Sequence, residues 1–307
     1  MRTWLRRTLF ALAALLLLVG AAYYWLFIDS HIPSDATYSL DLDRVRAAAA
    51  SVPGDKPGAI EVEQVALFTF PGVGVVAGDS WNGVPLPVYS YRLIYPDNSS
   101  IIVDTGMTAD MGSGELTSFD AGALARIQAA MSTATQIVIT HEHMDHIGGL
   151  TAHAGLASVL PKTRLTQEQL AHPDRSLPAK FPDHALDGYQ PLVYEQYHAL
   201  APGVVLIKAP GHTPGSQIVY VQTASGTELL FIGDVAWHFR NIELQRERAR
   251  LMTMLFLKED RTAVFGELVA LKHLHESQPA VRIVPGHDGP VIDALVADGV
   301  LKRRFSP

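Results

Sequence analysis

Cysteine is absent from the 307 residues of this chain. Its absence excludes disulfide bonds, thiolate metal ligands, a lipidated cysteine and a cysteine nucleophile. The chain also has no excess of positive charge, since it contains 24 Lys and Arg and 31 Asp and Glu. Its composition therefore gives no indication of nucleic-acid binding. No G-x-S-x-G pattern occurs, which removes the usual serine nucleophile turn. The 48% of hydrophobic residues is enough for a globular core.

One long apolar run lies at the N-terminus, where residues 8–28 carry no charge. As a helix this run would be about 31 Å long, which is enough to cross a bilayer. Arginines precede it and aromatic residues lie near its far end, the flanks typical of a membrane anchor: Arg2, Arg6, Arg7, Tyr23, Tyr24 and Trp25. We therefore expect residues 1–28 to be a single-pass anchor in the inner (plasma) membrane, with the rest of the chain on the periplasmic side. The alternative is a signal peptide cleaved after Gly20-Ala21-Ala22, which the continuing apolar run disfavours.

The rest of the chain divides into a short linker and one large domain. Residues 29–58 hold Pro33, Pro53 and Pro57 and predict a stalk with one short helical pattern. Strand patterns begin at residue 59, and a hairpin with a Pro-Asp-Asn-Ser turn is predicted over residues 87–106. Strand patterns fall into two sets, before and after about residue 190, with helical spacing at residues 121–131, 242–258 and 262–275. This order predicts an α+β fold of two packed sheets with helices outside, spanning residues 59–307.

Histidines and a carboxylate are concentrated where the strand pattern "QIVIT" ends. The next residues, "HEHMDH", contain His141, His143, Asp145 and His146. The first two histidines project on one side of an extended segment, and the next two side chains follow as the chain turns. The pair Gly148-Gly149 is expected to allow a tight turn. This is not the helical H-E-x-x-H zinc motif, because the preceding segment is strand-like.

Three further ligand-type residues follow other predicted strands. His212 stands in "PGHTPGS" after "VVLIKA", Asp234 ends "ELLFIGD", and His287 follows "RIV" in "VPGHD". Loops at strand ends are where functional sites gather, since the sheet holds them rigidly. Histidine and carboxylate without sulfur suit zinc, manganese, iron or cobalt. The sequence therefore predicts a metal site built from these loops.

These motifs resemble those of the metallo-β-lactamase superfamily. "HEHMDH" is similar to its H-x-H-x-D-H signature, and "IIVDTG", "GHTPGS", "FIGD" and "VPGHD" follow in the family's order from about residue 59 to 293. The resemblance implies a four-layer αβ/βα sandwich with two divalent metal ions, zinc in the first place and iron or manganese as alternatives. It implies His141, His143 and His212 on the first ion, Asp145, His146 and His287 on the second, Asp234 as a bridge, and Asp104 as a support behind the ligands.

A two-metal centre would generate hydroxide near neutral pH and stabilise a developing oxyanion. Asp145 would hold the hydroxide and pass its proton to the leaving group, and Asp234 would complete the catalytic pair. We therefore expect hydrolysis of a small-molecule acyl substrate such as a lactone, a thioester or a similar ester. An iron-dependent redox enzyme similar to persulfide dioxygenases, a β-lactam hydrolase without a cysteine ligand, and a non-catalytic binding protein remain open. Nothing in the sequence indicates the oligomeric state.

Two features near Asp234 bear on the substrate. Acyl-homoserine-lactone lactonases, which the motif resembles, carry a tyrosine three residues after the bridging aspartate, and this position is Trp237 here. Trp237 is expected either to line the pocket or to donate a hydrogen bond, with the adjacent His238 as a substitute for the phenol. Residues 241–260 are expected to form helices covering the substrate. Most of their apolar side chains should pack on the core, with some left to face the pocket or the membrane.

Overall fold

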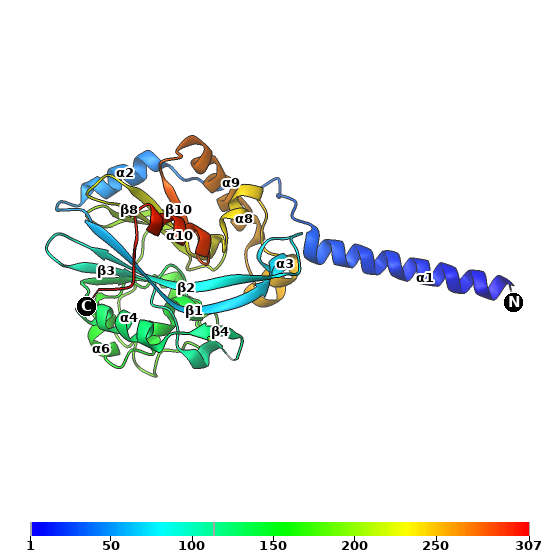
Figure 1. Ribbon diagram of the computed structural model, residues 1–307, viewed down its shortest axis with the longest axis horizontal. Helices are drawn as coiled ribbons and strands as arrows, with labels where there is room; N and C mark the ends of the chain where they lie inside the picture. The colour runs from blue at the N-terminus through cyan, green and yellow to red at the C-terminus, as the bar shows by residue number, and fades with distance from the viewer. Residues whose placement is uncertain (1, 113, 307) are drawn as a thin grey trace.

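The protein is described by a computed structural model that covers residues 2–112 and 114–306. Its globular body has four layers, helix, sheet, sheet and helix, and one long helix projects from it (Figure 1). The predicted α+β sandwich is therefore confirmed. The division of the strands near residue 190 holds with one exception: every strand of the second sheet begins at Tyr197 or later, but the C-terminal strand β11 joins the first sheet.

Apart from β11 at the C-terminus, the two sheets are formed by successive parts of the chain. The first has the order β11-β1-β2-β3-β5, with β4 on the other side of part of β1: β11 (Lys302–Arg303), β1 (Ala59–Pro71), β2 (Gly83–Ile94), β3 (Ser100–Val103), β5 (Gln136–Val138) and β4 (Leu116–Phe119). The second has the order β10-β9-β8-β7-β6: β10 (Arg282–Val284), β9 (Glu228–Phe231), β8 (Gln217–Gln222), β7 (Val204–Lys208) and β6 (Tyr197–Ala201). The predicted hairpin is the antiparallel pair β2–β3.

The main core lies between the sheets, where Leu93, Val103, Leu206 and Val219 are fully buried. Strands covered on both faces read as continuous apolar runs, which explains sequences such as "VVLI". The outer face of the first sheet is covered by α4 (Ala121–Thr133), α5 (Met144–Thr151) and α6 (Leu156–Val159). The outer face of the second is covered by α2 (Leu42–Ser51) and α9 (Arg261–Ser277). Shorter helices join these layers: α3 (Gly72–Val75), α7 (Gln167–Ala171), α8 (Phe239–Leu244) and α10 (Gly289–Ala297).

Helix α2 corrects the expectation of a stalk over residues 29–58. Leu42, Val45 and Ala49 are buried in the core that covers the second sheet. Arg46 on the same helix donates two hydrogen bonds to Glu228 at the start of β9, at 2.7 and 2.8 Å. The short helical pattern is amphipathic, and its apolar stripe packs on the sheet, so residues 42–51 belong to the globular body.

The N-terminal helix α1 (Arg2–Tyr23) continues into a π-helical turn, η1 (Tyr24–Ile28). The span Thr3–Ile28 is long and apolar enough to cross a membrane, and its most apolar part makes no buried contact with the body. It projects from the end of the body that carries α3 (Figure 1). A membrane anchor and a signal sequence both have these properties.

The helical pattern within residues 242–258 corresponds to two short segments. Helix α8 ends at Leu244, Gln245 takes a left-handed φ of 50°, and a separate π-helical segment η5 (Met252–Leu257) follows. One local expectation was wrong. Gly148 and Gly149 do not form a turn, since α5 continues through both. A side chain at either position would collide with residues 105–107, so these glycines allow the helix to pack closely against that loop.

Candidate metal centre

The segment after β5 places four candidate ligands in two different directions. The chain bends at residues 140–143 after β5 ends at Val138, His143 has an extended backbone, and α5 then begins at Met144 with His143 as its N-terminal cap. Asp145 and His146 therefore lie in the first helical turn, rotated away from the two preceding histidines. This change from extended chain to helix explains how six residues can serve two neighbouring points.

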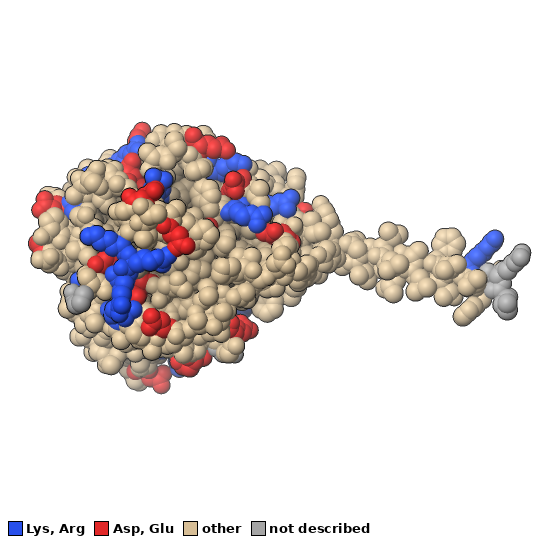
Figure 2. All heavy atoms as spheres, viewed as in Figure 1, with Lys and Arg blue, Asp and Glu red and all other residues tan. Residues whose placement is uncertain are grey.

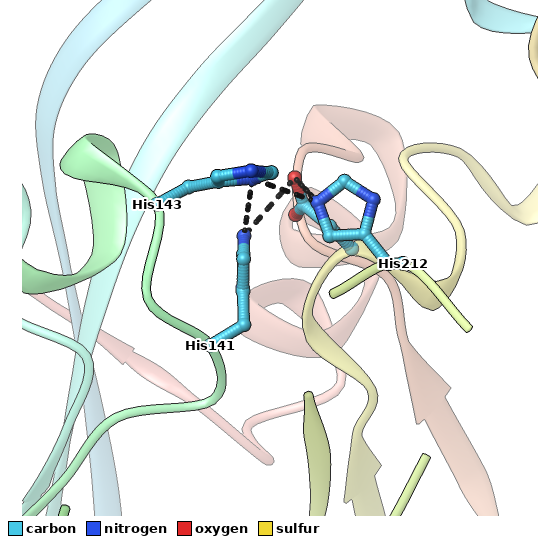
Figure 3. A group of neighbouring side chains, drawn as sticks. His141, His143 and His212 are labelled. Carbon is cyan, nitrogen blue, oxygen red and sulfur yellow. Dashed lines mark hydrogen bonds and ion pairs between the residues drawn. The ribbon is translucent and has the colours of Figure 1, made fainter. Parts of the chain in front are cut away.

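The first point is surrounded by His141, His143, His212 and Asp234, whose nearest ligand atoms lie within 4.8 Å of one another. His143 Nδ1 lies 3.1 Å from His141 Nε2 and 2.9 Å from His212 Nε2. Asp234 Oδ2 is 3.5 Å from His212 Nε2 and 3.7 Å from His141 Nε2. The three rings, from two separate loops, converge on one position (Figure 3).

The second point is surrounded by Asp145, His146 and His287. Asp145 Oδ2 lies 3.6 Å from His146 Nε2 and 3.4 Å from His287 Nε2. The other oxygen of Asp234, Oδ1, is 3.3 Å from His146 Nε2 and 3.2 Å from His287 Nε2. Asp234 thus directs one oxygen to each cluster, which is the geometry of a bridging carboxylate.

Three of the histidines are held by hydrogen bonds at the ring nitrogen that points away from the clusters. His146 Nδ1 is 2.8 Å from Asp104 Oδ2, His287 Nδ1 is 2.9 Å from the Pro87 carbonyl, and His212 Nδ1 is 2.5 Å from Glu259 Oε1. Metal-binding histidines almost always have such partners, which fix the ring and the tautomer. The arrangement leaves Nε2 of each ring facing the clusters.

Asp104 is the most connected of these supports. It is buried and has a left-handed φ of 57°. Its carboxylate accepts the Thr140 backbone N–H at 2.6 Å and the Thr140 hydroxyl at 2.8 Å, in addition to the contact with His146. The structure therefore places Asp104 behind the candidate ligands, at the position that the resemblance implied.

The side chains fit a pair of divalent ions. His146 Nε2 and Asp234 Oδ1 are buried and have no hydrogen-bond partner within the described chain, although buried polar atoms are rarely left unpaired. The spacings of 2.9 to 3.7 Å are close to the edge of a tetrahedron whose centre is about 2.0–2.1 Å from each nitrogen, the usual zinc–histidine distance. Imidazole and carboxylate with no sulfur also suit iron and manganese.

Burial and charge act differently on the two clusters. Burial lowers the pKa of His141 and His143 well below the usual value, which favours the neutral, ligand-competent ring. Burial opposes protonation of His146 as well, but the carboxylates of Asp104, Asp145 and Asp234 outweigh it and raise its pKa. Burial also opposes ionisation of Asp234, yet the adjacent histidines outweigh it and hold the pKa of Asp234 well below the usual range. A negative charge is therefore favoured at the shared position.

A buried chain of side chains behind the clusters was not foreseen. Glu259 contacts His212 and forms an ion pair with Arg248, and both charged side chains are at most 1% exposed. The Arg248 guanidinium lies 5.0 Å from the centre of the Trp237 ring, whose indole N–H donates to Asp234 Oδ2 at 2.7 Å. This network, which we call the Glu259–Arg248–Trp237 relay, joins two candidate ligands. Trp237, Arg248 and Glu259 are separated by up to 22 positions in the sequence and match no known motif, so no spacing pattern identifies them.

Above the clusters lies an open pocket of about 540 Å³ whose floor includes His143, Asp145, Asp234 and His287. Its wall is mostly apolar, including Phe68, Phe70, Leu86, Trp237, Met252 and Leu257. Trp237 therefore both lines the pocket and binds Asp234. His238 does not substitute for a phenol, because it caps α8 and is not among the residues that line this pocket.

The sequence and the fold place the chain in a known family. A family model described as "Metallo-beta-lactamase superfamily" matches residues 83–287, which is more than half of the chain, and the chain belongs to this superfamily. It is a metallo-hydrolase of that fold. Among curated relatives, N-acyl homoserine lactonase of Bacillus thuringiensis is 26% identical over 175 residues, covering 52% of this chain and 67% of the relative. The N-acyl homoserine lactonase of Bacillus cereus is 24% identical over 179 residues, covering 53% and 69%.

Solved structures show the same fold. An N-acyl homoserine lactone hydrolase with N-hexanoyl-L-homoserine bound at its catalytic metal centre aligns with a TM-score of 0.61 at 18% identity, covering 78% of this chain and 96% of the other. A dizinc quorum-quenching lactonase, AidC, aligns with a TM-score of 0.52 at 16% identity, covering 79% and 92%. These structural matches confirm the predicted sandwich fold.

Proposed function

We propose that the chain is a lactone hydrolase with two divalent metal ions, zinc in the first place, held by the two clusters. One observation carries the proposal: seven ligand-type side chains converge on two adjacent points at the floor of a largely apolar pocket. The similarity to N-acyl homoserine lactonases supports a lactone with an acyl side chain as the substrate.

In this proposal His141, His143 and His212 hold one ion, Asp145, His146 and His287 hold the other, and Asp234 bridges them. Bound together, the two ions would supply a hydroxide at neutral pH and stabilise the oxyanion formed from the carbonyl. Asp145 orients the attacking oxygen, since its carboxylate is the least buried of the acidic ligands and faces the pocket. Water adds to the carbonyl carbon, the ring C–O bond breaks, and Asp145 passes the proton to the departing alkoxide, so the product is a hydroxy acid.

We also propose that residues 1–28 anchor the enzyme in the inner membrane, with residues 59–307 as the catalytic domain on the periplasmic side. The arginines before the apolar run of residues 8–28 and the apolar length of Thr3–Ile28 support this orientation. A reporter fused after Pro307 that is active only in the cytoplasm would contradict it.

A hydrolysis screen tests the function. Purified zinc-loaded protein is given N-acyl homoserine lactones, thioesters and β-lactams, with His287→Ala as the impaired variant and exposed His184→Ala as the matched control. We expect lactones to be hydrolysed faster than thioesters and β-lactams. His287→Ala should lose this hydrolysis, and His184→Ala should retain it. Metal analysis, together with a measurement of oxygen consumption in the presence of persulfides, distinguishes the iron-dependent redox alternative from hydrolysis. Turnover of β-lactams or thioesters in preference to lactones would overturn the proposed substrate.

A further inference from the structure

Three consecutive large apolar side chains are exposed on η5. Met254, Leu255 and Phe256 are 51%, 64% and 68% exposed. We call these residues the apolar wedge. The sequence predicted that some apolar side chains of residues 241–260 would face the pocket or the membrane, and this group points outward. A contiguous exposed apolar group beside a ligand pocket marks an interaction surface.

The residues just before the wedge are fixed to the base of the N-terminal helix. Arg250 forms an ion pair with Asp29, and its guanidinium lies 4.7 Å from the centre of the Trp25 ring. The Gly78 N–H, in the loop after α3, donates to the Phe27 carbonyl at 2.8 Å. Figure 1 shows the gold segment that follows α8 passing next to α3, at the end of the body from which α1 projects. The wedge and α1 are therefore held at one end of the molecule.

The length of α1 indicates where the membrane surface would lie. Arg7 is the last charge before the apolar run, and the 20 residues from Thr8 to Phe27 span about 30 Å, the thickness of the hydrocarbon core. The outer boundary then falls at Phe27, where the helix joins the body. The rings of Phe27 and Trp81 lie 5.2 Å apart there, and the Trp81 indole donates to the Tyr23 hydroxyl at 3.0 Å.

Aromatic side chains with a polar edge favour this interfacial depth. In the view of Figure 2 the projecting helix is uncharged along its length up to its far end, and the charged side chains lie on the body. With α1 as the proposed anchor, this end of the body would lie next to the bilayer surface.

The wedge is continuous with the pocket. Phe256 and Leu257 line it, and Arg175, which also lines the pocket, donates to the Leu257 and Lys258 carbonyls at 2.5 and 2.9 Å. Lys258, two residues after Phe256, is exposed, and its ammonium lies 3.9 Å from the Asp174 carboxylate. One rim of the pocket is therefore formed by the wedge itself.

We propose that the apolar wedge inserts into the leaflet at which α1 ends, and that a substrate with a long acyl chain enters the pocket from the bilayer past Phe256. The occupant of this surface is lipid rather than another protein, because the wedge lies at the end of the body from which the proposed anchor α1 projects. The lipid contact rests on the proposed anchor, and the nature of the substrate rests on the proposed lactone hydrolysis.

The absence of native cysteine allows a direct test of insertion. Leu255→Cys and the control Val193→Cys are each labelled with a polarity-sensitive fluorophore in the full-length chain, in phosphatidylcholine nanodiscs. Val193 is 67% exposed and precedes β6, on which α2 packs far from α1 (Figure 1). We expect the label at Leu255 to shift to the blue and to be quenched by spin-labelled lipid, while the label at Val193 does neither. Equal behaviour of the two labels would overturn insertion.

The second arm tests the substrate route. Met254→Ser/Leu255→Ser should lower kcat/KM about tenfold for a decanoyl lactone dissolved in the bilayer, while a butanoyl lactone in water changes less than about twofold. Val193→Ser should change neither rate. Equal losses for both lactones would overturn entry from the bilayer. If the wild type hydrolyses neither lactone, the proposed function is wrong, and the fluorophore result still decides whether the wedge contacts lipid.

Discussion

Replacing Glu259 with glutamine tests the Glu259–Arg248–Trp237 relay. Burial opposes the ionised form of Glu259, but Arg248 and His212 outweigh it and lower its pKa, so the carboxylate is charged in the native protein. The substitution leaves the Arg248 guanidinium buried without a counter-charge, which costs about 3–5 kcal/mol of unfolding free energy for such a buried pair. It also weakens the orientation of His212, and loss of such a partner lowers metal affinity about 10- to 100-fold.

Two measurements separate these effects. Chemical denaturation of the metal-free protein gives the stability, and competition with a chelator gives the zinc affinity. The double variant Glu259→Gln/Arg248→Met removes both buried charges, so stability should largely return while zinc affinity stays low. Exposed Glu243→Gln is the matched control. If Glu259→Gln keeps both its stability and its zinc affinity, the relay does not support the metal centre.

Three further predictions concern neighbouring residues. Trp237→Phe keeps the apolar wall but removes the N–H bound to Asp234, so kcat should fall about tenfold in a lactone assay, with a smaller change in KM. Gly149→Ala would drive a methyl group into the Thr105 carbonyl and should cost about 1–3 kcal/mol by denaturation. Burial raises the pKa of Glu267 to about 8, so the folded state holds a proton that the unfolded state releases at lower pH. The contribution of Glu267 to stability is fully present below the pKa of the unfolded state and is lost as the pH rises towards 8. Metal-free wild type should therefore lose about 1–3 kcal/mol relative to Glu267→Gln between pH 5.5 and 7.5, and parallel pH profiles would contradict this.

The fold was largely predictable because strands buried on both faces produce continuous apolar runs. The runs "VVLI" and "QIVYV" predicted strands, and the position of ligand residues after such runs predicted that they meet at one edge. The "HEHMDH" motif is local, so its change of direction could be inferred from spacing alone, whereas the start of α5 at Met144 was not predicted. His212, Asp234 and His287 needed the family resemblance to be assigned to particular clusters.

The remaining features depend on packing between segments distant in sequence. Arg248 and Glu259 are charged residues in a polar stretch, and nothing local shows that both are buried. The side chains of α2 form a short amphipathic stripe that could equally have faced solvent or a partner. The apolar wedge is the opposite case, because its composition resembles that of a buried helix while its side chains are exposed.

Metal content of folded variants tests the central claim most directly. Asp234 directs one oxygen to each cluster, so a bridging role predicts that its loss weakens both sites, whereas loss of His287 weakens the second. Elemental analysis should give about two ions per chain for the wild type, about one for His287→Ala and well below one for Asp234→Ala, with lactone turnover reduced by orders of magnitude in the last. If Asp234→Ala is folded, retains about two ions per chain and turns over lactone at a near-normal rate, the bridged two-metal centre is wrong.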